Sequence, residues 1–172
     1  MSESESDWSE TSAVVESDAD RIRQNDKFLN KCVIDWNSDA VDILDALKHN
    51  TVVRTVTFHT VCSEQLNREV LVKMSEVMKC NKSVESLTIY IQRGLLRERF
   101  FAAMATSGGW SSIQGLQLFY DDTNIEPLSL REAEHISSFV IQCENLHTYS
   151  LDIEGDESAP ILETLSRTDI KV

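Results

Sequence analysis

The chain has 172 residues, of which 41% are hydrophobic and 7% aromatic, and these values are typical of a single globular domain with a sizeable core. Its net charge of -13 at pH 7 argues against nucleic acid or an anionic membrane as the main partner, because both are bound by basic surfaces. The sequence has no apolar run near the roughly 20 residues of a membrane-spanning helix, and its four cysteines lack close pairing, so it is expected to be cytoplasmic or nuclear and reduced.

The N-terminal segment differs in composition from the rest of the chain. Residues 1–20 contain seven Asp or Glu residues and no Lys or Arg. Residues 1–15 have too few apolar side chains to offset the entropy of ordering, so they are predicted to form a disordered acidic tail. Val14 and Ile22 then begin a helical spacing, which predicts a short helix over 16–25 that caps the first strand.

Strands and helices are predicted to alternate after this cap. Apolar residues at helical spacing predict helices from Ser38 or Asp39 to Asn50, and over 66–80, 95–106, 130–143 and 158–167. Asn50 and Asn81 are expected to end two of them, because Asn tolerates the left-handed conformation that closes helices. Gly108 and Gly109 are expected to end the third.

One apolar pattern recurs between these helices. It reads Asn50-x-x-Val53-x-x-Val56-x-Phe58 and then Asn81-x-x-Val84-x-x-Leu87-x-Ile89. The same spacing returns at Leu29, Cys32 and Ile34, at Ile113, Leu116 and Leu118, and at Leu146, Tyr149 and Leu151, with a clipped copy at Ile170. Repetition at this period is typical of a solenoid, in which each unit buries its apolar face against its neighbours.

A doubly wound parallel sheet would also alternate strands and helices. Its strands are buried on both faces and read as continuous apolar runs. Here polar residues interleave the apolar ones, as in Thr55, Thr57 and His59 around Val56 and Phe58. One face of the sheet must therefore meet water, which favours an α/β solenoid with parallel strands on the concave face and helices on the convex face.

The repeat unit resembles that of ribonuclease-inhibitor-like leucine-rich repeat proteins. The resemblance covers residues 26–172 as about five and a half irregular repeats, each a strand motif followed by an amphipathic helix. Ran GTPase-activating proteins and nucleotide-binding immune receptors share this repeat type, and the absence of a nucleotide-binding domain excludes a full receptor. The family often places Asn or Cys three residues past the last strand anchor, where this chain has Asn37, Val61, Gln92, Asp121 and Glu154. That polar ladder is therefore mostly absent at these positions.

A partner-binding surface is predicted on the concave face. Adjacent repeats align His59, Tyr90 and Phe119 into an aromatic stripe about 10 Å long, since neighbouring strands lie about 4.8 Å apart. Asp35 and Asp152 flank the stripe, and Thr57, Thr88 and Gln117 form the adjacent polar row. Aromatic anchors within a polar rim are typical of a protein-binding centre.

Other polar groupings carry weaker signals. His59 and Cys62 lack the further ligands or orienting acid of a metal site or a catalytic dyad. Residues 121–126 lack the glycine and terminal Glu of a calcium loop. Arg93, Arg97 and Arg99 form a small basic cluster that could bind an acidic peptide but is more simply a solvated helix face. The sequence thus offers no catalytic residue, metal site or cofactor.

These observations favour a non-catalytic protein-binding scaffold whose protein partner is not identified by the sequence. A Ran-type GTPase-activating protein fragment and an acidic, chaperone-like binder of basic proteins are the alternatives. The chain stops two residues past Ile170, within an expected strand and without a capping repeat. That ending favours a piece of a longer array. Self-association through the open C-terminal edge strand, or protection of that edge by Lys171, would also account for it.

Overall fold

The computed structural model describes residues 17–36, 39–60, 68–91, 97–120 and 128–152, together with Ile161 and Glu163. Helices and strands alternate strictly within these ranges. The helices are α1 (Asp18–Arg23), α2 (Ala40–Leu47), α3 (Arg68–Cys80), α4 (Arg97–Thr106) and α5 (Leu130–Gln142). The strands are β1 (Lys31–Ile34), β2 (Thr55–Thr60), β3 (Ser86–Ile91), β4 (Gly115–Tyr120) and β5 (Thr148–Asp152). In these parts of the chain, no helix has the length and apolar character needed to span a membrane.

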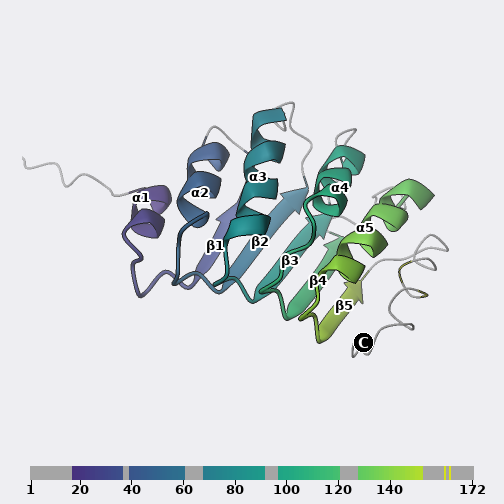
Figure 1. The fold of residues 1–172 in the computed structure, drawn as a ribbon. Helices are drawn as coiled ribbons and strands as arrows, with labels where there is room; N and C mark the ends of the chain where they lie inside the picture. The colour runs from purple at the N-terminus through teal and green to yellow at the C-terminus, as the bar shows by residue number, and fades with distance from the viewer. Residues whose placement is uncertain are drawn as a thin grey trace, which may run out of the picture.

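The five strands form one parallel sheet in the order β1-β2-β3-β4-β5. The labelled helices all lie on one face of this sheet, and none of them covers the other face (Figure 1). A doubly wound sheet carries helices on both faces, so this arrangement excludes it. The predicted solenoid, with strands on the concave side and helices on the convex side, is confirmed.

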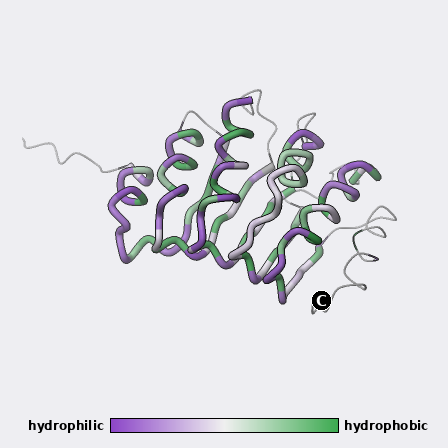
Figure 2. Tube along the Cα trace, in the orientation of Figure 1, coloured by the Kyte–Doolittle hydropathy of each residue, from purple (hydrophilic) through white to green (hydrophobic). Residues whose placement is uncertain are grey.

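The strand anchors build the core between the sheet and the helices. Val56, Leu87, Leu116 and Tyr149 lie opposite one another on adjacent strands, and all four are buried. Hydrophobic and hydrophilic residues are interspersed along the strands and helices (Figure 2), and successive side chains of a strand point to opposite faces of the sheet. At the N-terminal half of the core, the rings of Trp36 and Phe58 stack with centroids 5.4 Å apart.

The helices begin and end close to the predicted residues, but some of them end by a mechanism other than the predicted one. Ser17 caps α1 by accepting the Asp20 N–H, and Ser129 forms a capping box with Glu132 at the start of α5. The expectation that Asn50 and Asn81 end helices in the left-handed conformation is wrong. Among the described non-glycine residues, Asn25 alone has a positive φ.

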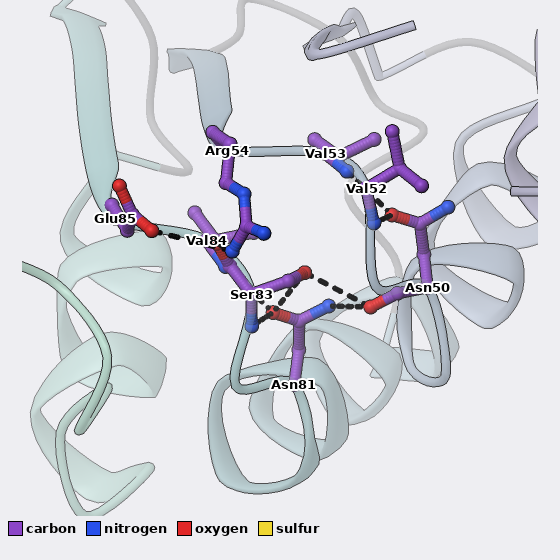
Figure 3. A network of polar contacts seen from close by, with 8 residues as sticks. All are labelled: Asn50, Val52, Val53, Arg54, Asn81, Ser83, Val84 and Glu85. Atoms are coloured by element: carbon purple, nitrogen blue, oxygen red, sulfur yellow. Dashed lines mark hydrogen bonds and ion pairs between the residues drawn. The ribbon is translucent and has the colours of Figure 1, made fainter. Parts of the chain in front are cut away.

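Asn50 and Asn81 instead join neighbouring repeats through their side chains, and we name this pair the asparagine ladder (Figure 3). The Asn81 amide nitrogen donates to the carbonyls of Leu47 and Asn50, at 2.7 and 3.1 Å, and its oxygen accepts from the N–H groups of Ser83 and Val84. Asn50 repeats this pattern one unit earlier, donating to the Ile22 carbonyl 2.7 Å away. Each asparagine therefore closes its own turn and fastens it to the preceding one.

Other residue types take the same position in later repeats. Trp110 Nε1 donates to the Asn81 carbonyl at 3.2 Å, so the indole packs against the neighbouring turn. Cys143 takes this position one repeat later, where its sulfur is in hydrogen-bond contact with the Trp110 backbone. The polar ladder thus lies three residues before the first strand anchor. The five positions where family resemblance would place it, Asn37, Val61, Gln92, Asp121 and Glu154, fall outside the described residues.

The structure describes only part of the segments predicted at the two ends of the chain. The predicted tail over 1–15 and the strand at Ile170, with its self-association edge, fall outside the described residues. Within the predicted helix 158–167, Ile161 and Glu163 are helical and Ile161 is buried.

Gly108 and Gly109 end α4 as predicted, and the two should respond differently to substitution. Both have positive φ, +85° and +76°, so alanine is strained at either position. A Cβ on Gly108 meets nothing within 4 Å, whereas one on Gly109 would lie 2.3 Å from the Gln142 carbonyl oxygen. We expect Gly108→Ala to lower the free energy of unfolding by about 1 kcal/mol and Gly109→Ala by about 2–3 kcal/mol, measured by urea titration. Equal losses would contradict this close approach of backbones.

Candidate functional site

The sheet face away from the helices, which we name the open face, carries three rows of side chains set by the strand register. The first row is Lys31, Thr55, Ser86, Gly115 and Thr148. The second is Val33, Thr57, Thr88, Gln117 and Ser150. The third row is His59, Tyr90, Phe119 and Asp152. Asp35, which directly follows β1, extends this row beyond His59. The register read from sequence is therefore the register of the structure.

His59, Tyr90 and Phe119 form a continuous aromatic stripe near the carboxyl ends of the strands. The ring centroids of His59 and Tyr90 are 5.1 Å apart at an interplanar angle of 73°, and those of Tyr90 and Phe119 are 5.7 Å apart at 30°. These separations lie in the range of favourable ring contacts. All three side chains are half-buried, so the stripe is preorganised and still meets solvent.

Acidic residues stand at both ends of this stripe. Asp35 Oδ1 lies 3.0 Å from His59 Nδ1, and the Asp35 side chain is 62% exposed. Asp152 is exposed beside Phe119 on β5. The Asp35 contact orients the imidazole against Tyr90 and places a carboxylate at one end of the stripe, as Asp152 does at the other.

The adjacent polar row is less accessible than its sequence indicates. Gln117 is exposed and Thr57 is half-buried. Thr88 is expected on the accessible surface but is only 7% exposed, because its hydroxyl lies 3.1 Å from Gln117 Oε1 and the longer amide covers it. Thr88 therefore contributes to this face through its contact with Gln117 rather than through an exposed surface of its own.

A shallow hollow lies at the opposite end of the same strands, and sequence reasoning missed it. Its volume is about 230 Å³, and it is lined by Ser86, Gly115, Leu116, Gln117, Thr148 and Ser150. Gly115 leaves the space because it has no side chain, and a Cβ there would meet only Ser86 Oγ at 3.8 Å. A glycine within a strand pattern was the available signal, since it often marks a close approach.

The described residues include neither a metal-binding cluster nor a buried cysteine with a lowered pKa. No three His, Cys, Asp or Glu side chains in this part of the chain come together in a way that could hold a metal ion. Burial raises the pKa of Cys32 to about 12 and that of Cys143 to about 11, so both stay protonated and unreactive at neutral pH. Cys80 is exposed, but it lies outside the open face.

The basic cluster expected on the helix over 95–106, which is α4 in the structure, is divided by the fold. Arg97 is 7% exposed and pairs with Glu132 of α5 through contacts of 2.5 and 3.0 Å. It is neither a solvated residue nor available to an acidic peptide, so that interpretation is wrong for Arg97. Arg99 is exposed on α4, and Arg93 falls outside the described residues.

Comparison with known proteins adds information on the fold. No protein-family model and no curated protein matches the chain. A solved structure of leiomodin-1 actin-binding site 2 is similar, with a TM-score of 0.55 and 18% identity over 87% of this chain and 86% of that one. A tropomodulin C-terminal domain from Caenorhabditis elegans has a TM-score of 0.54 and 11% identity over 87% of this chain and 89% of that one. At these identities the likeness shows that the chain has a leucine-rich-repeat-type fold.

Proposed function

We propose that this protein is a non-catalytic scaffold that binds a protein partner through the open face. The aromatic stripe of His59, Tyr90 and Phe119 carries the proposal, because its three rings are packed together and half-exposed on a face that no described helix covers. Aromatic side chains with two rotatable bonds gain contact area at a low entropic cost when a partner covers them. The rim of Asp35, Asp152 and Gln117 supplies the polar groups that fix orientation.

The aromatic stripe can contribute enough binding free energy to act as a small binding centre. Full burial of an exposed aromatic side chain contributes about 1.5–3 kcal/mol, and Tyr90 and Phe119 are already half-buried, so covering either one contributes roughly half of that, or about a fourfold to tenfold change in affinity. The Asp35–His59 contact adds little by itself, because Asp35 is largely exposed. The partner surface should therefore present apolar groups to the stripe and donors to its acidic ends.

We expect a His59→Ala, Tyr90→Ala, Phe119→Ala variant to bind its partner at least tenfold more weakly while remaining folded. Affinity capture from source-cell lysate identifies the partner, and calorimetry with that purified partner measures the dissociation constant. Circular dichroism and urea unfolding check the fold.

The matched control truncates three exposed apolar side chains on the helices, Val72, Leu130 and Ile141, to alanine. Retained affinity in this control together with its loss in the stripe variant supports the open face. Equal affinity of the intact chain and the stripe variant would reject it and move binding to another surface.

Actin is the specific partner to test first. The solved structure of leiomodin-1 that resembles this chain is an actin-binding site, and the likeness extends over 86% of it. Cosedimentation with actin filaments and the rate of actin polymerisation, each compared between the intact chain and the stripe variant, test this directly. No effect of the intact chain on either would exclude actin and leave the scaffold proposal standing.

The narrower resemblance to ribonuclease-inhibitor-like repeats, and with it a Ran-type GTPase-activating function, remains a proposal. The loops that follow the strands, where an activating polar residue would lie, fall mostly outside the described residues. Stimulated GTP hydrolysis by a small GTPase would support that function. The acidic, chaperone-like alternative predicts binding of basic proteins that weakens strongly with salt.

A further inference from the structure

A cationic pocket lies on a different surface, at the turns that lead from α2 into β2 and from α3 into β3. It has a volume of about 410 Å³, and its polar lining includes Lys48, His49, Thr51, Arg54, Cys80 and Lys82 beside the asparagine ladder. Its lining contains no Asp or Glu, although the whole chain has a net charge of -13. We name it the turn pocket.

The cations of the turn pocket are only loosely compensated. Lys48 lies 3.1 Å from Glu76 and Arg54 lies 3.2 Å from Glu85, both as partly exposed pairs whose attraction water screens. Arg54 also donates to the Ser83 carbonyl, which points its guanidinium across the turn of the next repeat (Figure 3). Lys82 Nζ donates to the neutral hydroxyl of Ser111, so its charge is not offset there. An anion that enters therefore meets Lys82 directly, beside two cations whose carboxylate partners lie outside the pocket lining.

The chain itself contains an anionic segment within reach. Residues 1–16 include five acidic side chains and no Lys or Arg. The Thr51 backbone N–H in the pocket donates to Asn25 Oδ1 2.8 Å away, and Asn25 lies two residues past the end of α1. The six residues of α1 span about 9 Å, whereas sixteen extended residues reach about 53 Å.

We infer that the turn pocket is an anion site that takes the carboxylates of residues 1–16 of the same chain. Single contacts of this kind are weak, but the tether supplies an effective concentration on the order of millimolar, so a millimolar affinity occupies about half of the molecules. Occupancy falls with ionic strength, because screening acts on exposed charges over about 10 Å at 0.1 M salt. This inference concerns a surface away from the aromatic stripe and does not depend on the proposed function.

The first experiment compares amide NMR spectra of the full chain with those of a full-length variant in which the tail is neutralised by Glu3→Gln, Glu5→Gln, Asp7→Asn and Glu10→Gln. At about 20 mM salt, we expect shift changes at Thr51, Cys80 and Lys82 that are at least twice those at Lys27 and Lys31, which are exposed cations closer in sequence to the tail. At about 0.5 M salt the difference between the two spectra should disappear.

A second measurement reports proximity directly and uses charge-matched variants. A nitroxide on Cys80, in a Cys62→Ser background, leaves Cys32 and Cys143 buried and should broaden the amides of residues 3–10 at low salt. Arg54→Gln with Lys82→Gln should reduce this broadening at least twofold, whereas Lys27→Gln with Lys31→Gln should leave it unchanged. Equal broadening in both double variants, or shift changes centred on Lys27 and Lys31, would overturn the inference.

Discussion

Asn81→Ala should lower the free energy of unfolding by about 3–5 kcal/mol, a large part of the total for a domain of this size. Asn81 is 1% exposed, and its side chain satisfies the Leu47 carbonyl and the N–H groups of Ser83 and Val84. Alanine leaves those groups buried without partners, at about 1–3 kcal/mol each. Urea unfolding followed by circular dichroism measures the loss, and an unchanged slope would show that the unfolded state is unaffected.

The control for this prediction is Asn145→Ala. Asn145 also donates to a carbonyl of the preceding repeat, that of Ser111 at 2.6 Å, but it does so on the surface. Water can replace that bond, so we expect a loss below about 1 kcal/mol. A similar loss in both variants would mean that the asparagine ladder contributes no more than an exposed hydrogen bond.

Arg97→Met should destabilise the protein by about 3–5 kcal/mol at pH 7, because it leaves the Glu132 carboxylate buried without its cation. Glu132 is held between Arg97 and the Ser129 N–H, which is 2.7 Å from Oε2. The pair joins the first turns of α4 and α5 and so fixes the spacing of two repeats. Arg97→Met with Glu132→Leu should recover most of the loss, since an apolar pair of similar volume needs no compensation.

The pH dependence of the Arg97→Met effect follows from the direction in which the pKa of Glu132 is shifted. Burial alone would raise the pKa of Glu132, but hydrogen bonds from Arg97 and Ser129 and the Arg97 charge lower it overall. A lowered folded-state pKa means that this stability is present above the unfolded value of about 4.3 and is lost as pH falls through the folded value. In Arg97→Met the burial effect prevails, so the destabilisation should shrink between pH 7 and pH 4. A penalty independent of pH over that range would show that lost packing, not the uncompensated charge, is its cause.

The strand register was predictable from sequence because it depends on spacing alone. In a solenoid each unit repeats the same anchor offsets, so equivalent residues meet on adjacent strands. His59, Tyr90 and Phe119 align on that basis, and the structure places them side by side. Binding also depends on the surface of the partner, so the role of these three residues in binding stays a prediction.

The side-chain contacts of the turns and helices were not predictable in the same way. The Asn81 position pointed to a helix end, but whether it acts through backbone conformation or side-chain bonds depends on the neighbouring turn. The Arg97–Glu132 pair joins residues 35 positions apart and leaves no local pattern, so Arg97 read as part of a solvated cluster. Thr88 shows the same limit, because a longer neighbour on the next strand covers it.

The residue three positions before the first strand anchor differs in type between repeats, so the repeats are not interchangeable with one another. Segment 50–80 begins with Asn50 and is followed by Asn81, so both of its junctions use the same amide chemistry. A duplicate inserted after Cys80 would present matching partners on each side and would widen the open face by one strand, about 4.8 Å. Segment 110–142 begins with an indole and is followed by a thiol, so a second copy would meet a mismatched junction. Engineered lengthening of this protein therefore has one natural point of insertion among its described repeats, between α3 and β3.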